Sequence, residues 1–257
     1  MLRVFKNLRH QVIYKKKMYR YLIYASGEIL LVVGGILIAL QVNNWNEARK
    51  ENQIEKELLL GLKEDLNETL TDLKSDVFTV NWILGVTDSL YQDLYIKNDV
   101  KPGSYKVPFW YTFVGGSLYS KQSAYQSIQS RGIHIIKNPN LRNAISDFYE
   151  LFLKRIQSAE NNLHLMQDNE LNPAFGLNGI IVHECTDCQT LPEILDIDNQ
   201  SPFNNKSYFI ITRPDNRLEQ QLMKYYRTNT RLLSLYHEAE SVLQENIRLI
   251  DSQIDIQ

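Results

Sequence analysis

One stretch of this chain is apolar almost without interruption. Residues 21–42 read YLIYASGEILLVVGGILIALQV and contain a single charged residue, Glu28. A helix rises about 1.5 Å per residue, so this stretch spans roughly 33 Å, whereas the hydrocarbon core of a bilayer is about 30 Å thick. The pattern therefore predicts a transmembrane helix over Tyr21–Val42.

After this stretch, apolar residues recur in steps of three and four, which is typical of amphipathic helices. Long helices are expected over residues 46–97, 141–171 and 217–251, and a short one over 117–131. The many charged residues of the first long helix are expected to form a solvated face. The fold class predicted is all-α, with a transmembrane helix followed by an antiparallel bundle of long helices.

The last helix has the most regular pattern. Its apolar positions alternate in steps of four and three, and two Asn residues share this heptad seam. The seam consists of Leu218, Leu222, Tyr225, Asn229, Leu232, Tyr236, Ala239, Leu243, Asn246 and Ile250. Such a seam packs either against other helices of the same chain or against a second chain, and the pattern leaves both open.

Residues 172–215 break the helical pattern, because four prolines fall within them. We expect an irregular insert here, before the last helix. Two short apolar runs inside it, 179–182 and 208–212, are candidates for a small two-stranded hairpin.

The charge distribution predicts an orientation for the span. Residues 1–20 contain seven Lys or Arg residues and no acidic residue, whereas charges after residue 42 are mixed. The positive-inside rule then makes residues 1–20 a basic cytoplasmic leader and residues 43–257 an extracytoplasmic domain. The exit of the apolar stretch has no small-x-small cleavage site, so a signal anchor is expected and not a removable signal peptide. In a Gram-negative cell the location would be the inner membrane, with the domain in the periplasm.

Two features of the span go beyond a plain anchor. A carboxylate in lipid is costly, so Glu28 is either a proton or helix-pairing site, or it lies near the cytoplasmic headgroups beside the basic leader. Small residues give one face on which two helices can approach closely, which makes a homo-oligomer or pairing with another membrane protein plausible. These residues are Gly27, Gly34, Gly35 and Ala39.

Outside the span, two clusters are candidate sites. Four aromatic residues directly after Pro108 are either a docking or ligand surface or the cap of the bundle core: Phe109, Trp110, Tyr111 and Phe113. The only cysteines, Cys185 and Cys188, are three positions apart, with two residues between them. They form a structural disulfide, remain free thiols, or serve metal or redox chemistry, with His183 as a third ligand.

Residues 24–47, YASGEILLVVGGILIALQVNNWNE, resemble the hallmark of an uncharacterised family of bacterial single-pass membrane proteins, with the pattern GEIxLVVxGILIALQxNNWNE. Residues 125–142 resemble a second motif of that family, which often has Ser-Gly where this chain has Ser130-Arg131-Gly132. The resemblance implies membrane anchorage and a mostly helical domain. It implies no activity.

Catalytic signatures are missing from the sequence. It contains no Walker-type phosphate loop, no G-x-S-x-G, no H-E-x-x-H and no dinucleotide fingerprint, and a net charge of −2 does not favour nucleic acid as a partner. We therefore expect no enzyme, no cofactor and no metal, and a bilayer as the main partner. The leading hypothesis is a membrane-anchored interaction, scaffold or sensory protein. The alternatives are an accessory subunit of an ion-driven membrane complex that uses Glu28, and a Cys-x-x-Cys redox or metal protein.

Overall fold

The computed structural model describes residues 18–97, 105–108, 115–182, 208–211 and 214–256. The chain divides into two compact units, Met1–Lys56 and Glu57–Gln257. Helix α2 (Met18–Tyr91, 74 residues) belongs to both units.

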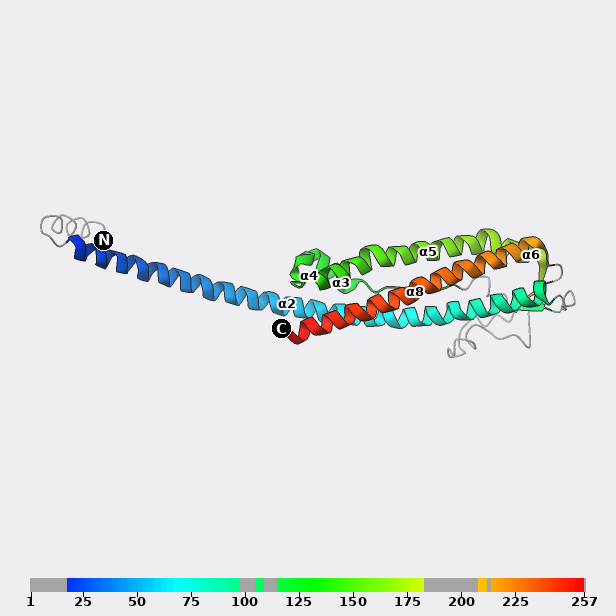
Figure 1. Cartoon of the computed structure of the whole chain (residues 1–257), viewed down its shortest axis with the longest axis horizontal. Helices are drawn as coiled ribbons and strands as arrows, with labels where there is room; N and C mark the ends of the chain where they lie inside the picture. Colours follow the sequence, from blue (N-terminus) through cyan, green and yellow to red (C-terminus); the bar gives the residue numbers. More distant parts are fainter. Residues whose placement is uncertain (1–17, 98–104, 109–114, 183–207, 212–213, 257) are drawn as a thin grey trace. The chain divides into compact units, whose positions relative to one another are not determined.

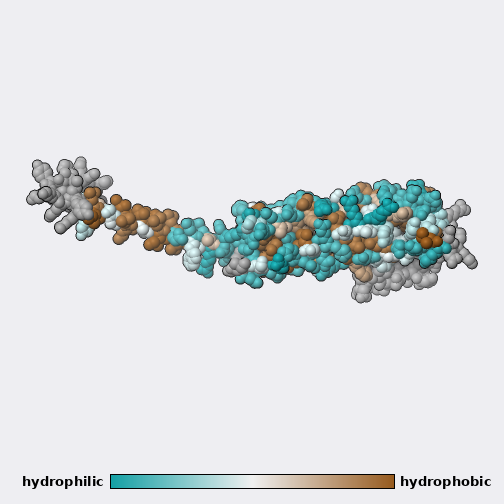
Figure 2. All heavy atoms as spheres, in the orientation of Figure 1, coloured by the Kyte–Doolittle hydropathy of each residue, from teal (hydrophilic) through white to brown (hydrophobic). Residues whose placement is uncertain are grey.

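The first unit contains the apolar part of α2. This confirms a helix over Tyr21–Val42, and within the described residues α2 alone is long and apolar enough to cross a membrane. Its apolar side chains are exposed; those of Leu30 and Leu31 are 71% and 77% accessible. Figure 2 shows this segment as a band of hydrophobic atoms, which contrasts with the mostly polar surface of the second unit. Exposed apolar side chains on every side of a helix are what a lipid environment requires.

The second unit is built from long helices (Figure 1). After α2 come the elements η1 (Gln92–Ile96), α3 (Ser123–Arg131), η3 (Ile133–Ile135), α4 (Pro139–Asp147), η4 (Phe148–Phe152), α5 (Leu153–Met166), η5 (Gln167–Leu171), α6 (Asn172–Asn178) and α8 (Asn216–Ile256). The elements η1, η4 and η5 are single π-helical turns, and η3 is a 3-10 turn. From α4 to α6 the helical stretches follow one another without a break, which confirms the helix expected over residues 141–171 and extends it at both ends.

Helix α8 runs antiparallel to α2. Lys63 near the start of this part of α2 pairs with Asp251 near the end of α8, at 2.6 Å, and Tyr91 at the end of α2 donates a hydrogen bond to Glu219 at the start of α8. The stretch α4–α6 is also antiparallel to α8, because Lys224 pairs with Glu170 while the amide of Asn246 lies near the carbonyl oxygen of Ala144. The three long helical stretches thus share one bundle, as predicted.

The heptad seam of α8 forms the centre of the core. All ten of its members are at most 1% exposed, and they pack against helices of the same chain. The structure therefore resolves the open question in favour of packing within the chain. The stretch from α4 to α5 buries apolar side chains at helical spacing as well: Leu141, Ile145, Phe148, Phe152, Ile156, Leu163 and Met166.

A small antiparallel sheet joins distant parts of the second unit. Strand β3 (Tyr208–Ile211) lies between β1 (Tyr105–Pro108) and β2 (Gly179–Val182), and Ile211 is opposite both Tyr105 and Gly179. The pairing of β2 with β3 confirms the predicted hairpin. The sequence pattern gave no indication of β1, which is only four residues long and contains Pro108 at the edge of the sheet.

Two boundaries differ from expectation. The expected helix over 117–131 begins only at Ser123, because residues 117–121 are extended and side chains of other helices bind their backbone N–H groups. The insert expected to be irregular over 172–215 begins with a helix, α6. Pro173 does not end the helix, because it directly follows the π-helical turn η5, where the regular α-helical hydrogen-bond pattern is already interrupted.

A corner between α3 and α4 occupies the centre of the stretch 125–142. Gly132 ends α3 with φ at +94°, a backbone conformation that favours glycine. Asn138 then caps α4, since its side chain accepts hydrogen bonds from the N–H groups of Asn140 and Leu141, and Pro139 occupies the first turn.

Candidate functional site

The candidate residues of the apolar segment all lie on α2. Glu28 and Ala39 are exposed, and a Cβ added at Gly27, Gly34 or Gly35 would meet no atom within 4 Å. The small-residue face is therefore open to another helix. The structure holds a single chain, so pairing through this face stays a prediction.

The two clusters predicted outside the span lie beyond the described residues. Phe109, Trp110, Tyr111 and Phe113 fall within 109–114, and Cys185 and Cys188 fall within 183–207. Their proposed roles as docking aromatics and as a disulfide remain predictions. Among the residues that the structure does describe, no three His, Cys, Asp or Glu side chains are arranged to hold a metal ion.

The structure reveals a polar site that the sequence did not indicate. Four α2 side chains in steps of four, three and four bind the backbone of the extended segment 117–122 and of the first turn of α3, which together run antiparallel to α2. We call these side chains the polar ladder: Asp65, Thr69, Asp72 and Asp76. The backbone N–H groups of Ser117, Tyr119, Lys121 and Ala124 donate to Asp76, Asp72, Thr69 and Asp65 respectively, with distances of 3.3, 2.8, 3.2 and 2.8 Å.

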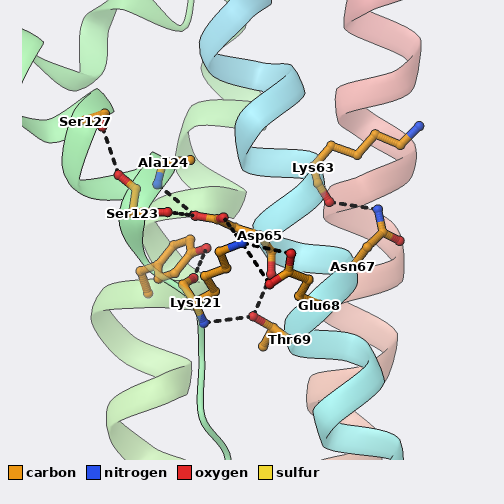
Figure 3. A network of polar contacts seen from close by, with 10 residues as sticks. Lys63, Asp65, Asn67, Glu68, Thr69, Lys121, Ser123, Ala124 and Ser127 are labelled. Atoms are coloured by element: carbon orange, nitrogen blue, oxygen red, sulfur yellow. Dashed lines mark hydrogen bonds and ion pairs between the residues drawn. The ribbon is translucent and has the colours of Figure 1, made fainter.

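Asp65 is the most buried acid of the ladder, at 4% exposure. Its Oδ2 accepts hydrogen bonds from the Ala124 N–H and from the hydroxyl of Ser123, both at 2.8 Å (Figure 3). These donors lie at the start of α3, where backbone N–H groups lack partners within the helix. The helix has no capping side chain of its own, so Asp65 supplies the cap from α2.

Lys121 balances part of this negative charge. Its ammonium group lies 2.8 Å from Glu68 and 3.6 Å from Asp65 (Figure 3). The Glu68 hydrogen bond raises the pKa of Lys121, so the lysine stays charged at neutral pH. On the opposite side, the hydroxyl of Tyr149 donates to the Lys121 carbonyl oxygen at 3.3 Å, which ties the segment to η4.

Further along the ladder, the carboxyl groups of Asp72 and Asp76 lie near that of Glu160. The pKa of Asp76 is raised to about 7, mainly by burial and to a smaller extent by the carboxylates of Asp72 and Glu160, against the opposing hydrogen bond from the Ser117 N–H. The Oδ2 atom of Asp76 is buried and has no hydrogen-bond partner among the described residues. At neutral pH Asp76 is therefore divided between its protonated and charged forms.

Glu160 on α5 faces the same segment from the other side. Its Oε1 accepts hydrogen bonds from the Leu118 N–H at 2.9 Å and from the Tyr236 hydroxyl at 2.7 Å. Burial raises the pKa of Glu160, and these two donors oppose the rise. Burial and the neighbouring Glu160 also raise the pKa of Tyr236, which therefore stays a hydrogen-bond donor throughout the physiological range. One carboxylate thus joins α5, α8 and the extended segment.

The sequence interpretation of the charged face of α2 was wrong for Asp65. The spacing 65, 69, 72, 76 repeats that of a core seam, but its residues are charged or polar and therefore resemble a solvated surface. Their partners are the backbone groups of a segment about fifty positions away. Every residue has backbone N–H and C=O groups, so the residue types of a segment do not show which side chains its backbone binds. The helical spacing of the four ladder residues was the one signal in the sequence.

A second polar feature lies on the outside of the bundle. A groove of about 770 Å³ runs between α5 and α8, and four of the side chains that line it are basic: Lys154, Arg155, Arg227 and Arg231. No sequence motif pointed to this groove, because its two sides come from separate helices.

These features define the class of protein: an all-α chain in which one long helix carries an apolar, membrane-length segment and also contributes to a helical bundle. The chain belongs to DUF6090, a family of unknown function, whose family model matches residues 28–181. The match extends from Glu28 into β2 and includes the polar ladder with its extended segment. Neither the curated proteins nor the solved structures include a significant match to the chain.

Proposed function

We propose that this protein is a membrane-anchored, non-catalytic interaction or sensory protein. Its apolar α2 segment inserts into the inner membrane, with the basic leader in the cytoplasm and the helical unit in the periplasm. The observation that carries the proposal is that a single helix supplies both the exposed apolar segment and the polar ladder of the bundle. A chain built in this way keeps a folded binding domain at a membrane surface.

The polar groups of the bundle support a structural and not a catalytic role. The carboxylates of Asp65, Asp72 and Glu160 already accept hydrogen bonds from backbone N–H groups, so they hold the fold together. A general base or nucleophile must instead face a site that a substrate can enter. The open groove between α5 and α8 is suited to binding.

The orientation is tested with alkaline phosphatase, which is active only in the periplasm, fused after residue 257. We expect activity from the full-chain fusion and none from a fusion that lacks residues 21–42. Activity in the second fusion, or none in either, contradicts the proposed anchoring.

The interaction role is tested by crosslinking in living cells, followed by denaturing purification of the full chain. We expect discrete adducts with another protein, and their loss when the chain is truncated after Lys56, which keeps the apolar segment. An unchanged adduct pattern after truncation places the interaction in the span alone. Substrate turnover by the purified full chain would refute the non-catalytic role.

A further inference from the structure

The groove between α5 and α8 has an excess of positive charge. Of the residues that line it, Lys154, Arg155, Arg227 and Arg231 are basic, and Glu150 is the single acid. Glu150 is already neutralised by Lys154, at 2.6 Å. The groove therefore carries three cations that no groove carboxylate balances.

The two arginines of α8 are available to a ligand. Arg227 and Arg231 are exposed, and neither forms an ion pair or hydrogen bond with any residue that the structure describes. They are four positions apart, which places both on one face of α8, one turn apart. Arg155 lies across the groove on α5 with its guanidinium 5.4 Å from the centre of the Phe152 ring, a contact that leaves its N–H groups free to bind an acid.

The shape of the groove favours an elongated ligand. On the side formed by η4 and α5 its lining runs from Glu150 to Asn162, which corresponds to about 18 Å or just over three helical turns. The small side chains of Ser158 and Ala159 keep it open along its middle. Small-molecule sites enclose most of their ligand, whereas an open groove between two helices is the geometry in which an amphipathic helix docks.

Apolar contacts are also available within this groove. Leu151 is 56% exposed on the α5 side, and Leu235 is partly exposed on the α8 side. An amphipathic helix that pairs carboxylates with the arginines can also place an apolar residue here. A free small acid would use the cations alone.

We propose that this groove binds an acidic amphipathic helix of a partner protein. Carboxylates four positions apart on that helix pair with Arg227 and Arg231, and a third meets Arg155. Paired guanidinium–carboxylate hydrogen bonds give this recognition its direction and register. The inference rests on the proposed interaction role and names the kind of partner that role requires.

The test uses the full chain in phosphatidylcholine nanodiscs and a fluorescent, helix-forming peptide of Ala and Glu, about four turns long, with Glu at i and i+4. The control peptide has Gln in place of each Glu. Fluorescence anisotropy measures binding to the wild type and to the double variant Arg227→Gln/Arg231→Gln. A matched variant, Arg217→Gln/Arg248→Gln, removes the same two charges from α8 outside the groove.

We expect the Glu peptide to bind and the Gln peptide to bind at least about tenfold more weakly. The groove variant should lose about tenfold in affinity for the Glu peptide, and the matched variant less than about twofold. Binding should also weaken as ionic strength rises from about 0.05 to about 0.3 M, because salt screens exposed charges. Circular dichroism melting confirms that each variant is folded.

Equal binding of the two peptides, no binding by the wild type, or unchanged affinity of the groove variant overturns the proposal. A wild-type dimer in sedimentation that Arg227→Gln/Arg231→Gln dissociates also overturns it, because a second copy then fills the groove. In-cell crosslinking separates this failure from a wider one. If the wild type forms adducts in cells but does not bind the peptide, the assignment of the groove as the binding site is refuted and the proposed interaction role stands. If the wild type forms no adducts, the interaction role itself is refuted.

Discussion

The unusual protonation of Asp76 predicts that neutralising it stabilises the protein at neutral and alkaline pH. Burial, with Asp72 and Glu160 nearby, raises the pKa of this carboxyl from its ordinary value of 3.8 to about 7 in the folded chain. Between these two values the folded state holds a proton that the unfolded state has released. Stability contributed by Asp76 is therefore complete below pH 4 and declines as the pH rises to 7.

The magnitude follows from the separation of the two pKa values. A difference of about three between the folded and unfolded pKa values corresponds to about 4 kcal/mol in the free energy of unfolding. The Asp76 side chain is partly exposed to solvent, which reduces this contribution to about 2 kcal/mol. Asp76→Asn removes the charge and keeps an oxygen that accepts the hydrogen bond from the Ser117 N–H. At pH 8 the variant should melt about 4 to 8 °C higher than the wild type, and at pH 4 the two should melt together.

The assay is thermal unfolding of the full chain in nanodiscs, followed by circular dichroism from pH 4 to pH 8. Asp88→Asn is the matched control, since Asp88 is exposed on the same helix. The control should keep the pH dependence of the wild type. If Asp76→Asn and the wild type lose stability in parallel as the pH rises, the assigned protonation of Asp76 is wrong.

Three further substitutions test the packing by the same melting assay. Asp65→Ala leaves two donors at the start of α3 without an acceptor and should lower the free energy of unfolding by about 3 kcal/mol. The control Glu68→Ala, on the exposed side of α2, should lower it by less than about 1 kcal/mol. Equal losses would contradict the capping role of Asp65. Gly132→Ala should destabilise the fold by about 1 to 2 kcal/mol, because φ at this residue is +94°. Gly85→Ala, in open space on α2, should instead stabilise the fold by about 0.5 to 1 kcal/mol. Two changes of the same sign would refute the positive φ assigned to Gly132. Gly116→Ala places a Cβ 2.5 Å from the Tyr236 hydroxyl, so it should destabilise by about 1 to 3 kcal/mol, and a neutral result would show that the extended segment lies elsewhere.

The sequence was most informative where one residue type repeats at helical spacing. The seam of α8 was predicted completely, because apolar side chains or Asn occupy every core position and each of them is buried. The apolar segment of α2 was predicted for the same reason. In both cases the regular spacing of apolar side chains along the helix is visible in the sequence itself.

The polar ladder could not be predicted in this way. Asp65 and Asp72 are acids on a helix rich in acids, and only the folded chain shows that they meet backbone N–H groups of residues 117–124. The same contacts explain the late start of α3. The groove was missed for a related reason. Arg227 and Arg231 line a groove only because α5 packs beside α8, and the sequence did not predict which faces of these two helices meet.

We propose that the helical unit engages a partner protein while α2 holds the chain in the membrane. Photocrosslinking in living cells tests it most directly, with benzoylphenylalanine in place of Leu151 in the groove or, as the control, in place of Lys74, which is exposed on α2. We expect a light-dependent adduct from position 151, none from position 74, and an acidic helix as the crosslinked peptide in mass spectrometry. No adduct at position 151, or an adduct only with a second copy of the chain, contradicts it.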